Sequence, residues 1–173
     1  AAGDAKALGL PLWVGEFGGP PASDSTILAQ HYGQQESRRI GGTLWLWKEN
    51  ANDSIANTFW GVYGPPFTGK DRRGAAQPER VRRTSRVYPL VTEGTLLRAT
   101  SNPFTGAATV SATAHRVPSG DRRQATVVDV PAVFHGRIRV TGASYSIVNR
   151  SGDREVWLYP RGGKYVLRVV PAR

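Results

Sequence analysis

Hydrophobic and polar positions in the first third of the chain alternate in two short stretches on either side of a helical stretch. Leu10 to Phe17 predicts a buried strand, and Thr43 to Trp47 predicts a second strand. Between them a helix is expected from about residue 23 to residue 39, because apolar side chains recur there at helical spacing, at Ile27, Leu28, His31 and Tyr32. This order predicts a βαβ unit with parallel strands. Two parallel strands cannot cover both of their faces, so we expect the unit to belong to something larger that this chain does not contain.

The second half of the chain shows a different pattern, with short stretches rich in Val, Thr, Tyr and Ile at intervals of about ten residues. Turn residues such as Pro118-Ser119-Gly120 separate the stretches. This spacing is typical of an antiparallel β-sandwich. The strands it predicts are Thr95–Thr100, Ala107–Ala114, Ala125–Val130, Arg137–Ile147, Glu155–Tyr159 and Tyr165–Val170.

A stretch rich in Pro, Gly and charge begins at Gly64 and separates the two patterns. We therefore expect an α/β domain over residues 1–63, a linker over residues 64–87, and an all-β domain over residues 88–173.

Composition excludes several classes of site. The 173 residues contain no cysteine and three histidines, so neither a disulfide nor a cysteine-based metal site can form, and we predict no metal and no cofactor. No apolar run reaches the length of a membrane span. The net charge is +10. Such a charge is compatible with an anionic partner or with a solvated arginine-rich surface, and we favour the second, without nucleic acid as a partner.

Candidate chemistry lies at the end of the first predicted strand, in Leu12-Trp13-Val14-Gly15-Glu16-Phe17-Gly18. Strict alternation places Glu16 on one face with Leu12 and Val14, and the other face holds Trp13, Gly15 and Phe17. A carboxylate there either pairs with a neighbouring loop or serves catalysis, since residues at the carboxyl ends of barrel strands face the active site.

The second predicted strand ends with Trp45 and Trp47 on one face. An indole can stack on a sugar ring, and the alternative is that both side chains belong to a core. Candidate substrate-binding residues are therefore Trp45, Trp47, Lys48, Glu49 and Asn50.

These two segments resemble strands 7 and 8 of glycoside hydrolase family 5. The Gly15-Glu16-Phe17-Gly18 motif is similar to the one that holds the family's catalytic nucleophile, and Trp47 matches its substrate-stacking tryptophan. Phe59-Trp60-Gly61-Val62-Tyr63 and the stretch from Arg86 to Gly94 resemble the endoglycoceramidase-like branch.

The resemblance implies that residues 1–63 are the last βαβ portion of a (β/α)8 barrel, followed by the sandwich. It also implies a secreted or extracellular retaining β-glucosidase whose substrate is a glycolipid or another β-glucoside. The family's acid/base Glu lies in an Asn-Glu motif on strand 4, and this sequence contains no such pair. We therefore expect the isolated chain to be inactive.

Two other functions are compatible with the sequence. One is a sandwich that binds carbohydrate or a membrane surface through Tyr145, Trp157, Tyr159 and Tyr165, although large aromatic side chains are more often core residues. The other is a basic, nucleic-acid-binding linker, or one that steers the enzyme to an anionic membrane. Its cations are Lys70, Arg72, Arg73, Arg80, Arg82, Arg83 and Arg86, and no aromatic side chain lies among them to stack on bases.

Overall fold

The structure is a computed structural model that describes residues 2–23, 25–45, 61–64 and 74–171. The chain divides into two compact units, Ala1–Thr84 and Ser85–Arg173, which are treated separately below. The described residues include no helix with the length and hydrophobicity that a membrane crossing requires.

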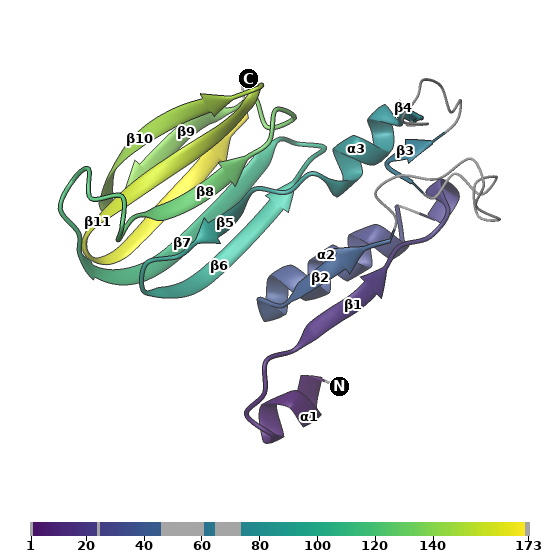
Figure 1. Cartoon of the computed structure of the whole chain (residues 1–173), viewed down its shortest axis with the longest axis horizontal. Coiled ribbons are helices and arrows are strands. Elements are labelled where there is room, and N and C mark those ends of the chain that lie inside the picture. The colour runs from purple at the N-terminus through teal and green to yellow at the C-terminus, as the bar shows by residue number, and fades with distance from the viewer. Residues whose placement is uncertain (1, 24, 46–60, 65–73, 172–173) are drawn as a thin grey trace. The chain divides into compact units, whose positions relative to one another are not determined.

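Unit 1 contains the predicted βαβ unit. Strands β1 and β2 pair in parallel, and α2 lies between them in the chain (Figure 1). Residues 78–84, inside the range expected to be a linker, form a helix instead. The elements of this unit are α1 (Ala2–Ala7), β1 (Trp13–Phe17), the 3-10 turn η1 (Pro21–Ser23), α2 (Ile27–Arg38), β2 (Gly41–Leu44), β3 (Tyr63–Gly64), β4 (Ala75–Ala76) and α3 (Pro78–Thr84).

Helix α2 covers one face of the β1–β2 pair through aromatic contacts. The Phe17 ring stacks on His31 and meets Tyr32 edge-on, with 5.3 Å between ring centroids in both cases. Phe17 and Leu28 are buried. Helix α2 thus uses the apolar positions that the helical spacing predicts, and it fixes which face of the strands is turned towards the helix.

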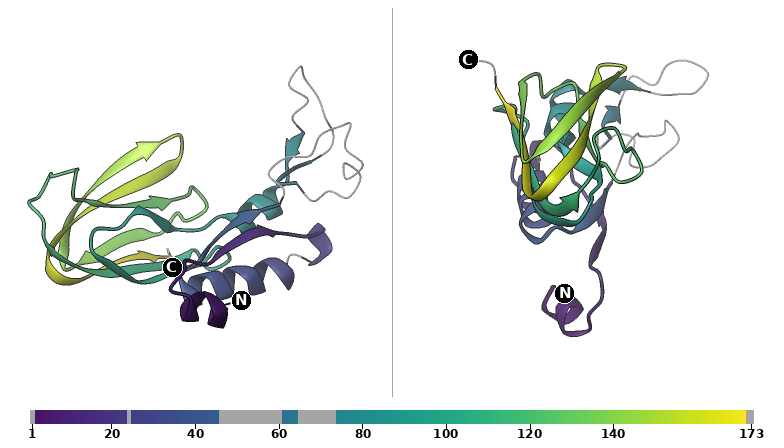
Figure 2. Two further views of the ribbon diagram at one scale, coloured as in Figure 1. Left: turned by 60° about the horizontal axis from the view of Figure 1, so that its bottom comes forward. Right: turned by 90° about the vertical axis from the view of Figure 1, so that its left-hand side faces the viewer.

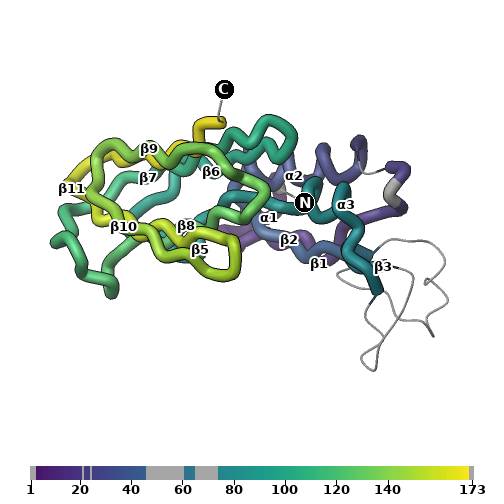
Figure 3. Tube along the Cα trace, turned by 90° about the horizontal axis from the view of Figure 1, so that it is seen from above, coloured from purple at the N-terminus to yellow at the C-terminus, as the bar shows by residue number. Residues whose placement is uncertain are grey.

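Unit 2 is a single antiparallel sheet of seven strands, in which β11 pairs with four others. The first half of β11 pairs with β8 and β10, and its second half pairs with β7 and β9. Figure 3 separates these two halves, with β9, β7 and β6 on one side and β10, β8 and β5 on the other. The strands are β5 (Tyr88–Val91), β6 (Thr95–Asn102), β7 (Ala107–Arg116), β8 (Thr126–Val130), β9 (Arg137–Thr141), β10 (Ala143–Arg150) and β11 (Asp153–Val170).

In unit 1, β2 begins at Gly41, two residues before the expected start at Thr43, and in unit 2 the strand β5 was not expected. Two further strands of unit 2 are divided differently from the prediction. Arg137–Ile147 was expected to be one strand, but Gly142, with a φ of 74°, interrupts it between β9 and β10. Conversely, Glu155–Tyr159 and Tyr165–Val170 are parts of one strand, β11. Gly162 and Gly163 adopt positive φ values, and β11 bends there without ending (Figure 2). The expected two-sheet sandwich is therefore one bent, nearly closed, barrel-like sheet.

The core of unit 2 lies between the two halves of this sheet. Val110, Val128, Leu158 and Leu167, one from each of the central strand segments, are fully buried. The sheet nearly closes where the Ser101 hydroxyl of β6 accepts from the Val87 N–H and donates to the Val87 carbonyl, at 2.9 Å and 3.0 Å.

A row of polar side chains crosses the first half of this sheet, from Tyr88 on β5 through Asp129 on β8 to Glu155 on β11. Partial burial raises the pKa of the Asp129 carboxyl above its ordinary value, and the nearby Asp153 and Glu155 carboxylates raise it further. The folded protein therefore holds a proton at Asp129 more readily than the unfolded chain does. The ionised form consequently destabilises the fold once the pH rises through the folded-state pKa.

Replacing this carboxylate should stabilise the protein at neutral pH. We expect Asp129→Asn to raise the free energy of unfolding at pH 7 by up to about 1 kcal/mol, since like charges directly opposite each other on adjacent strands are unfavourable. The gain should disappear as the pH falls below the ordinary range for an aspartate. Urea unfolding at several pH values measures it, and equal or lower stability of the variant at pH 7 would contradict the electrostatic assignment.

Candidate active site

Glu16 lies at the end of β1, one residue before the strand ends at Phe17. Its side chain is exposed, and it has no hydrogen-bond or ion-pair partner among the residues that the structure describes. The sequence left open whether this carboxylate pairs with a neighbouring loop. In the described part of the chain no cation neutralises it.

The pairing of β1 with β2 contains an irregularity next to Glu16. Val14 pairs with Gly42, and Phe17 pairs with Leu44. Three steps along β1 therefore correspond to two steps along β2, which is the geometry of a β-bulge. The extra residue shifts the alternation of side chains by one position between Val14 and Phe17.

The two glycines of β2 show which side chain lies on which face. A methyl group on Gly41 would come within 2.1 Å of the Trp13 ring, and one on Gly42 would come within 3.1 Å of the Phe17 ring. Because neighbouring residues of a strand point to opposite faces, Trp13 and Phe17 lie on opposite faces. The prediction that they share a face was wrong, and the bulge is the reason.

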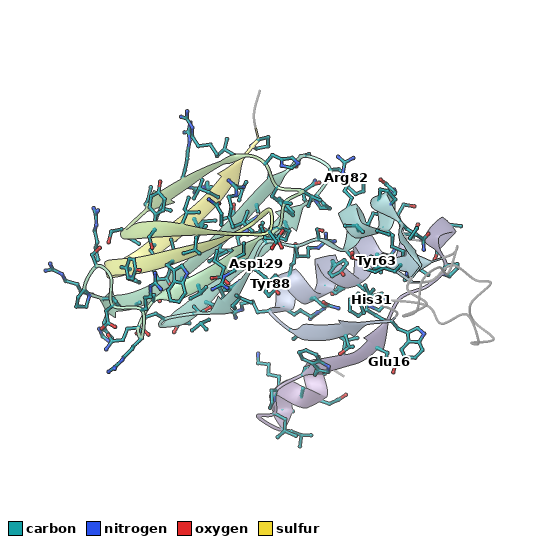
Figure 4. All side chains as sticks on the ribbon, turned by 45° about the horizontal axis from the view of Figure 1, so that its top comes forward. Glu16, His31, Tyr63, Arg82, Tyr88 and Asp129 are labelled. Carbon is teal, nitrogen blue, oxygen red and sulfur yellow. The ribbon has the colours of Figure 1, made fainter. Side chains whose placement is uncertain are left out.

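Glu16 directly precedes Phe17, so its side chain points away from α2, towards the face that holds Trp13. Figure 4 shows Glu16 and His31, which α2 carries, on opposite sides of β1. The earlier grouping of Glu16 with Val14 is corrected, because Val14 lies on the helix side of the bulge. The sequence signal for this feature was Gly15, since a glycine inside a strand often marks a bulge.

Trp45 lies beside the end of β1. Its backbone N–H donates to the Phe17 carbonyl at 2.7 Å, which extends the parallel ladder one residue past β2. Alternation from Leu44 then turns its side chain away from α2, and 36% of the residue's surface is exposed. Glu16, Trp13 and Trp45 thus share the face opposite α2, while Trp47, Lys48, Glu49 and Asn50 lie outside the described residues.

Gly18 fixes the distance between the two strand ends. A methyl group at this position would lie 1.9 Å from the Trp45 carbonyl oxygen. Only glycine therefore permits the close approach that places Trp45 beside the carboxyl end of β1.

The aromatic side chains considered for carbohydrate binding do not form one exposed surface. Tyr165 and Tyr159 are buried. Tyr165 donates to the Glu93 carbonyl at 2.8 Å and also bonds to the Thr126 hydroxyl. Tyr145 is exposed, but its position opposite Leu158 places it on the other sheet face from Trp157. Tyr159 and Tyr165 are thus core residues, as favoured from the sequence, and the four aromatic side chains do not share one face.

The arginine-rich segment is also not a uniform basic surface. Arg80 is buried in unit 1, with 2% of its surface exposed. Arg83 forms an ion pair with Glu79 at 2.9 Å within α3. Lys70, Arg72 and Arg73 lie outside the described residues.

No family model matches this sequence, and no curated protein matches it. Solved structures do share its fold. Endo-glycoceramidase II from Rhodococcus sp., in its lactosyl-enzyme intermediate, is 21% identical with a TM-score of 0.69 over 99% of this chain and 36% of its own. An endogalactoceramidase is 16% identical, with a TM-score of 0.70 over 98% of this chain and 36% of its own. Sterylglucosidase 1 from Cryptococcus neoformans is 16% identical, with a TM-score of 0.62 over 94% of this chain and 28% of its own.

This chain therefore spans about a third of the length of these enzymes. The resemblance that the motifs predicted is confirmed at the level of the fold, across both units.

The role of Gly18 can be tested against a matched glycine of the same strand region. We expect Gly18→Ala to lower the free energy of unfolding by about 1–3 kcal/mol, because its methyl group displaces the Trp45 backbone. Gly15 has no atom within 4 Å of the corresponding position, so Gly15→Ala should change stability by less than about 0.5 kcal/mol. Urea unfolding followed by tryptophan fluorescence compares the two, and equal effects would refute the close approach.

Proposed function

We propose that this chain is the C-terminal part of a retaining β-glycosidase of glycoside hydrolase family 5, with Glu16 as its nucleophile. In this proposal β1 and β2 are strands 7 and 8 of a (β/α)8 barrel. The proposed domains are residues 1–63 and 88–173, and the segment 64–87 that connects them includes the helix α3. The proposed substrate is a glycolipid or another β-glucoside, and the enzyme acts outside the cell.

One observation carries the proposal. An exposed carboxylate, without a partner among the described residues, stands at the carboxyl end of a parallel strand, on the face opposite the covering helix. In a (β/α)8 barrel the helices lie outside and the carboxyl ends of the strands surround the active site. Glu16 has the position that this architecture assigns to a catalytic residue, and Trp45 lies at the same end of the neighbouring strand.

The enzymes that share the fold support the class of substrate. The names of two of them describe cleavage of glycosylated ceramides, and the third name describes action on a sterol glucoside. The Rhodococcus enzyme has also been solved with ganglioside GM3. Its lactosyl-enzyme intermediate is the covalent species of a retaining mechanism.

The chemistry follows from the position of Glu16. A Glu16 carboxylate oxygen attacks the anomeric carbon as the bond from that carbon to the leaving oxygen breaks, which gives a glycosyl ester on Glu16. A second carboxyl group, about 5–5.5 Å away, protonates the leaving oxygen and later removes a proton from the water that cleaves the ester. An exposed indole on the same face, such as Trp45, offers a stacking surface for the sugar.

This chain does not supply the second carboxyl group of the family pattern, because it contains no Asn-Glu pair. We therefore propose that the 173-residue chain alone does not turn over substrate. Release of the aryl group from an aryl β-glucoside by the purified chain would contradict this part of the proposal.

The assignment of the nucleophile is tested in the polypeptide that joins this sequence to the rest of the barrel. A 2-fluoro β-glucoside with a good leaving group should label Glu16, because the fluorine slows hydrolysis of the ester. Glu16→Gln should abolish labelling and lower kcat by at least about four orders of magnitude.

Peptide mass spectrometry locates the label, and Glu36→Gln, on the helix α2, provides a matched control that should keep both labelling and activity. Labelling at another residue, or an active Glu16→Gln enzyme, would end the assignment.

A further inference from the structure

The strands of one half of unit 2 carry positive charge without any negative charge. This half consists of β6, β7, β9 and the second part of β11, residues 161–170. None of these four segments contains an aspartate or a glutamate. They hold five exposed cations whose side chains share the outer face: Arg98, Arg137, Arg139, Lys164 and Arg168.

The pairing register shows that these cations share one face. Leu167 is buried in the core, so its neighbour Arg168 points outward. Arg139 lies directly opposite Arg168 on β9, and Thr109 lies opposite it on β7. Arg137 and Lys164 follow at even spacing along the same strands, and Arg98 lies opposite Ser111, two residues from Thr109 on β7. We call this set the cationic face.

This arrangement is unfavourable in the free protein. Like charges directly opposite each other on neighbouring strands destabilise a sheet, as Arg139 and Arg168 must. Among the described residues none of the five cations has an ion-pair partner, and the one bond that Arg98 makes is to the Thr100 hydroxyl at 3.3 Å. An external anion would relieve this repulsion.

The shape and chemistry of the face select the kind of anion. Between the cations lie short side chains, Thr109, Ser111, Thr113 and Val166, so the surface is a flat sheet face. The tyrosine of these strands, Tyr165, points into the core, so the ring that the outer face offers for base stacking is the His115 imidazole at the end of β7. A flat array of cations fits a planar anionic surface better than a single strand of nucleic acid.

We propose that the cationic face binds the anionic headgroups of a lipid bilayer. The surface differs from the arginine-rich linker considered from the sequence, because all five cations lie on strands of unit 2. The choice of a membrane rests on the proposed function, since a glycolipid substrate is presented there. The choice of these residues rests on charge and register alone.

Vesicle sedimentation tests the proposal with the full 173-residue chain. The protein should bind vesicles that contain phosphatidylserine, should not bind vesicles of phosphatidylcholine alone, and should dissociate as salt is raised. Arg137→Gln/Arg139→Gln/Arg168→Gln should weaken binding about a hundredfold at low salt.

A matched control variant replaces three exposed arginines that lie outside the cationic face. This variant, Arg38→Gln/Arg122→Gln/Arg123→Gln, should weaken vesicle binding at most a few-fold. The melting temperature of the first variant should not fall, because it relieves the Arg139–Arg168 repulsion.

Three results would overturn the proposal. The first is equal binding of the chain to vesicles with and without phosphatidylserine. The second is an equal loss of vesicle binding in the two triple variants. The third is displacement of the bound chain by duplex DNA at a lower concentration than by phosphatidylserine vesicles. The last result would assign the same cations to nucleic acid. These vesicles contain no glycolipid, so Glu16→Gln should bind them like the unaltered chain. A failed vesicle test would therefore not affect the assignment of Glu16 as nucleophile. A failed labelling test would likewise not affect the assignment of the cationic face.

Discussion

One extra residue in β1 determines what the rest of unit 1 can do. Phe17 must pack on His31 and Tyr32 to hold α2 against the strands. With strict alternation Trp13 would then also face the helix. The bulge between Val14 and Phe17 instead leaves Trp13 on the face opposite α2, to which Glu16 also points. The bulge therefore brings Trp13 to the face on which Glu16 lies as the neighbour of Phe17, and Gly18 holds the adjoining strand end in place.

Unit 2 shows how register creates properties that composition does not reveal. The net charge of +10 fits a solvated arginine-rich surface as well as it fits an anionic partner. Strand pairing adds the arrangement of the charges. Arg139 lies opposite Arg168, on strand segments that contain no carboxylate. Asp129 and Glu155 lie opposite each other in the other half of the sheet. Like charges that lie opposite each other cost stability in both halves, and in the half that holds Asp129 the Arg150 guanidinium forms an ion pair with Glu155 at 2.8 Å.

The sequence was sufficient for the βαβ unit, the place of Glu16 at a strand end and most strands of unit 2, because these depend on local periodicity and turn residues. The sequence was insufficient to predict what each glycine does to a strand, because a glycine can end a strand, bend it or lie in a bulge. Gly142 ends a strand, Gly162 and Gly163 bend one without ending it, and Gly15 lies in a bulge. Which of these occurs depends on the partner strand, and pairing partners cannot be inferred from the glycine itself. The cationic face was missed for the same reason.

The orientation of Glu16 is the claim on which the account of function depends, and the absence of cysteine makes it directly measurable. Single cysteines at positions 13, 14 and 16 of this chain can be compared by their rates of reaction with a maleimide. The bulge predicts fast reaction at positions 13 and 16, and reaction slower by about tenfold or more at position 14, which faces α2. If positions 14 and 16 both react slowly while position 13 reacts fast, the strand alternates regularly. Glu16 would then point towards the helix, which would contradict the orientation that the proposed function requires.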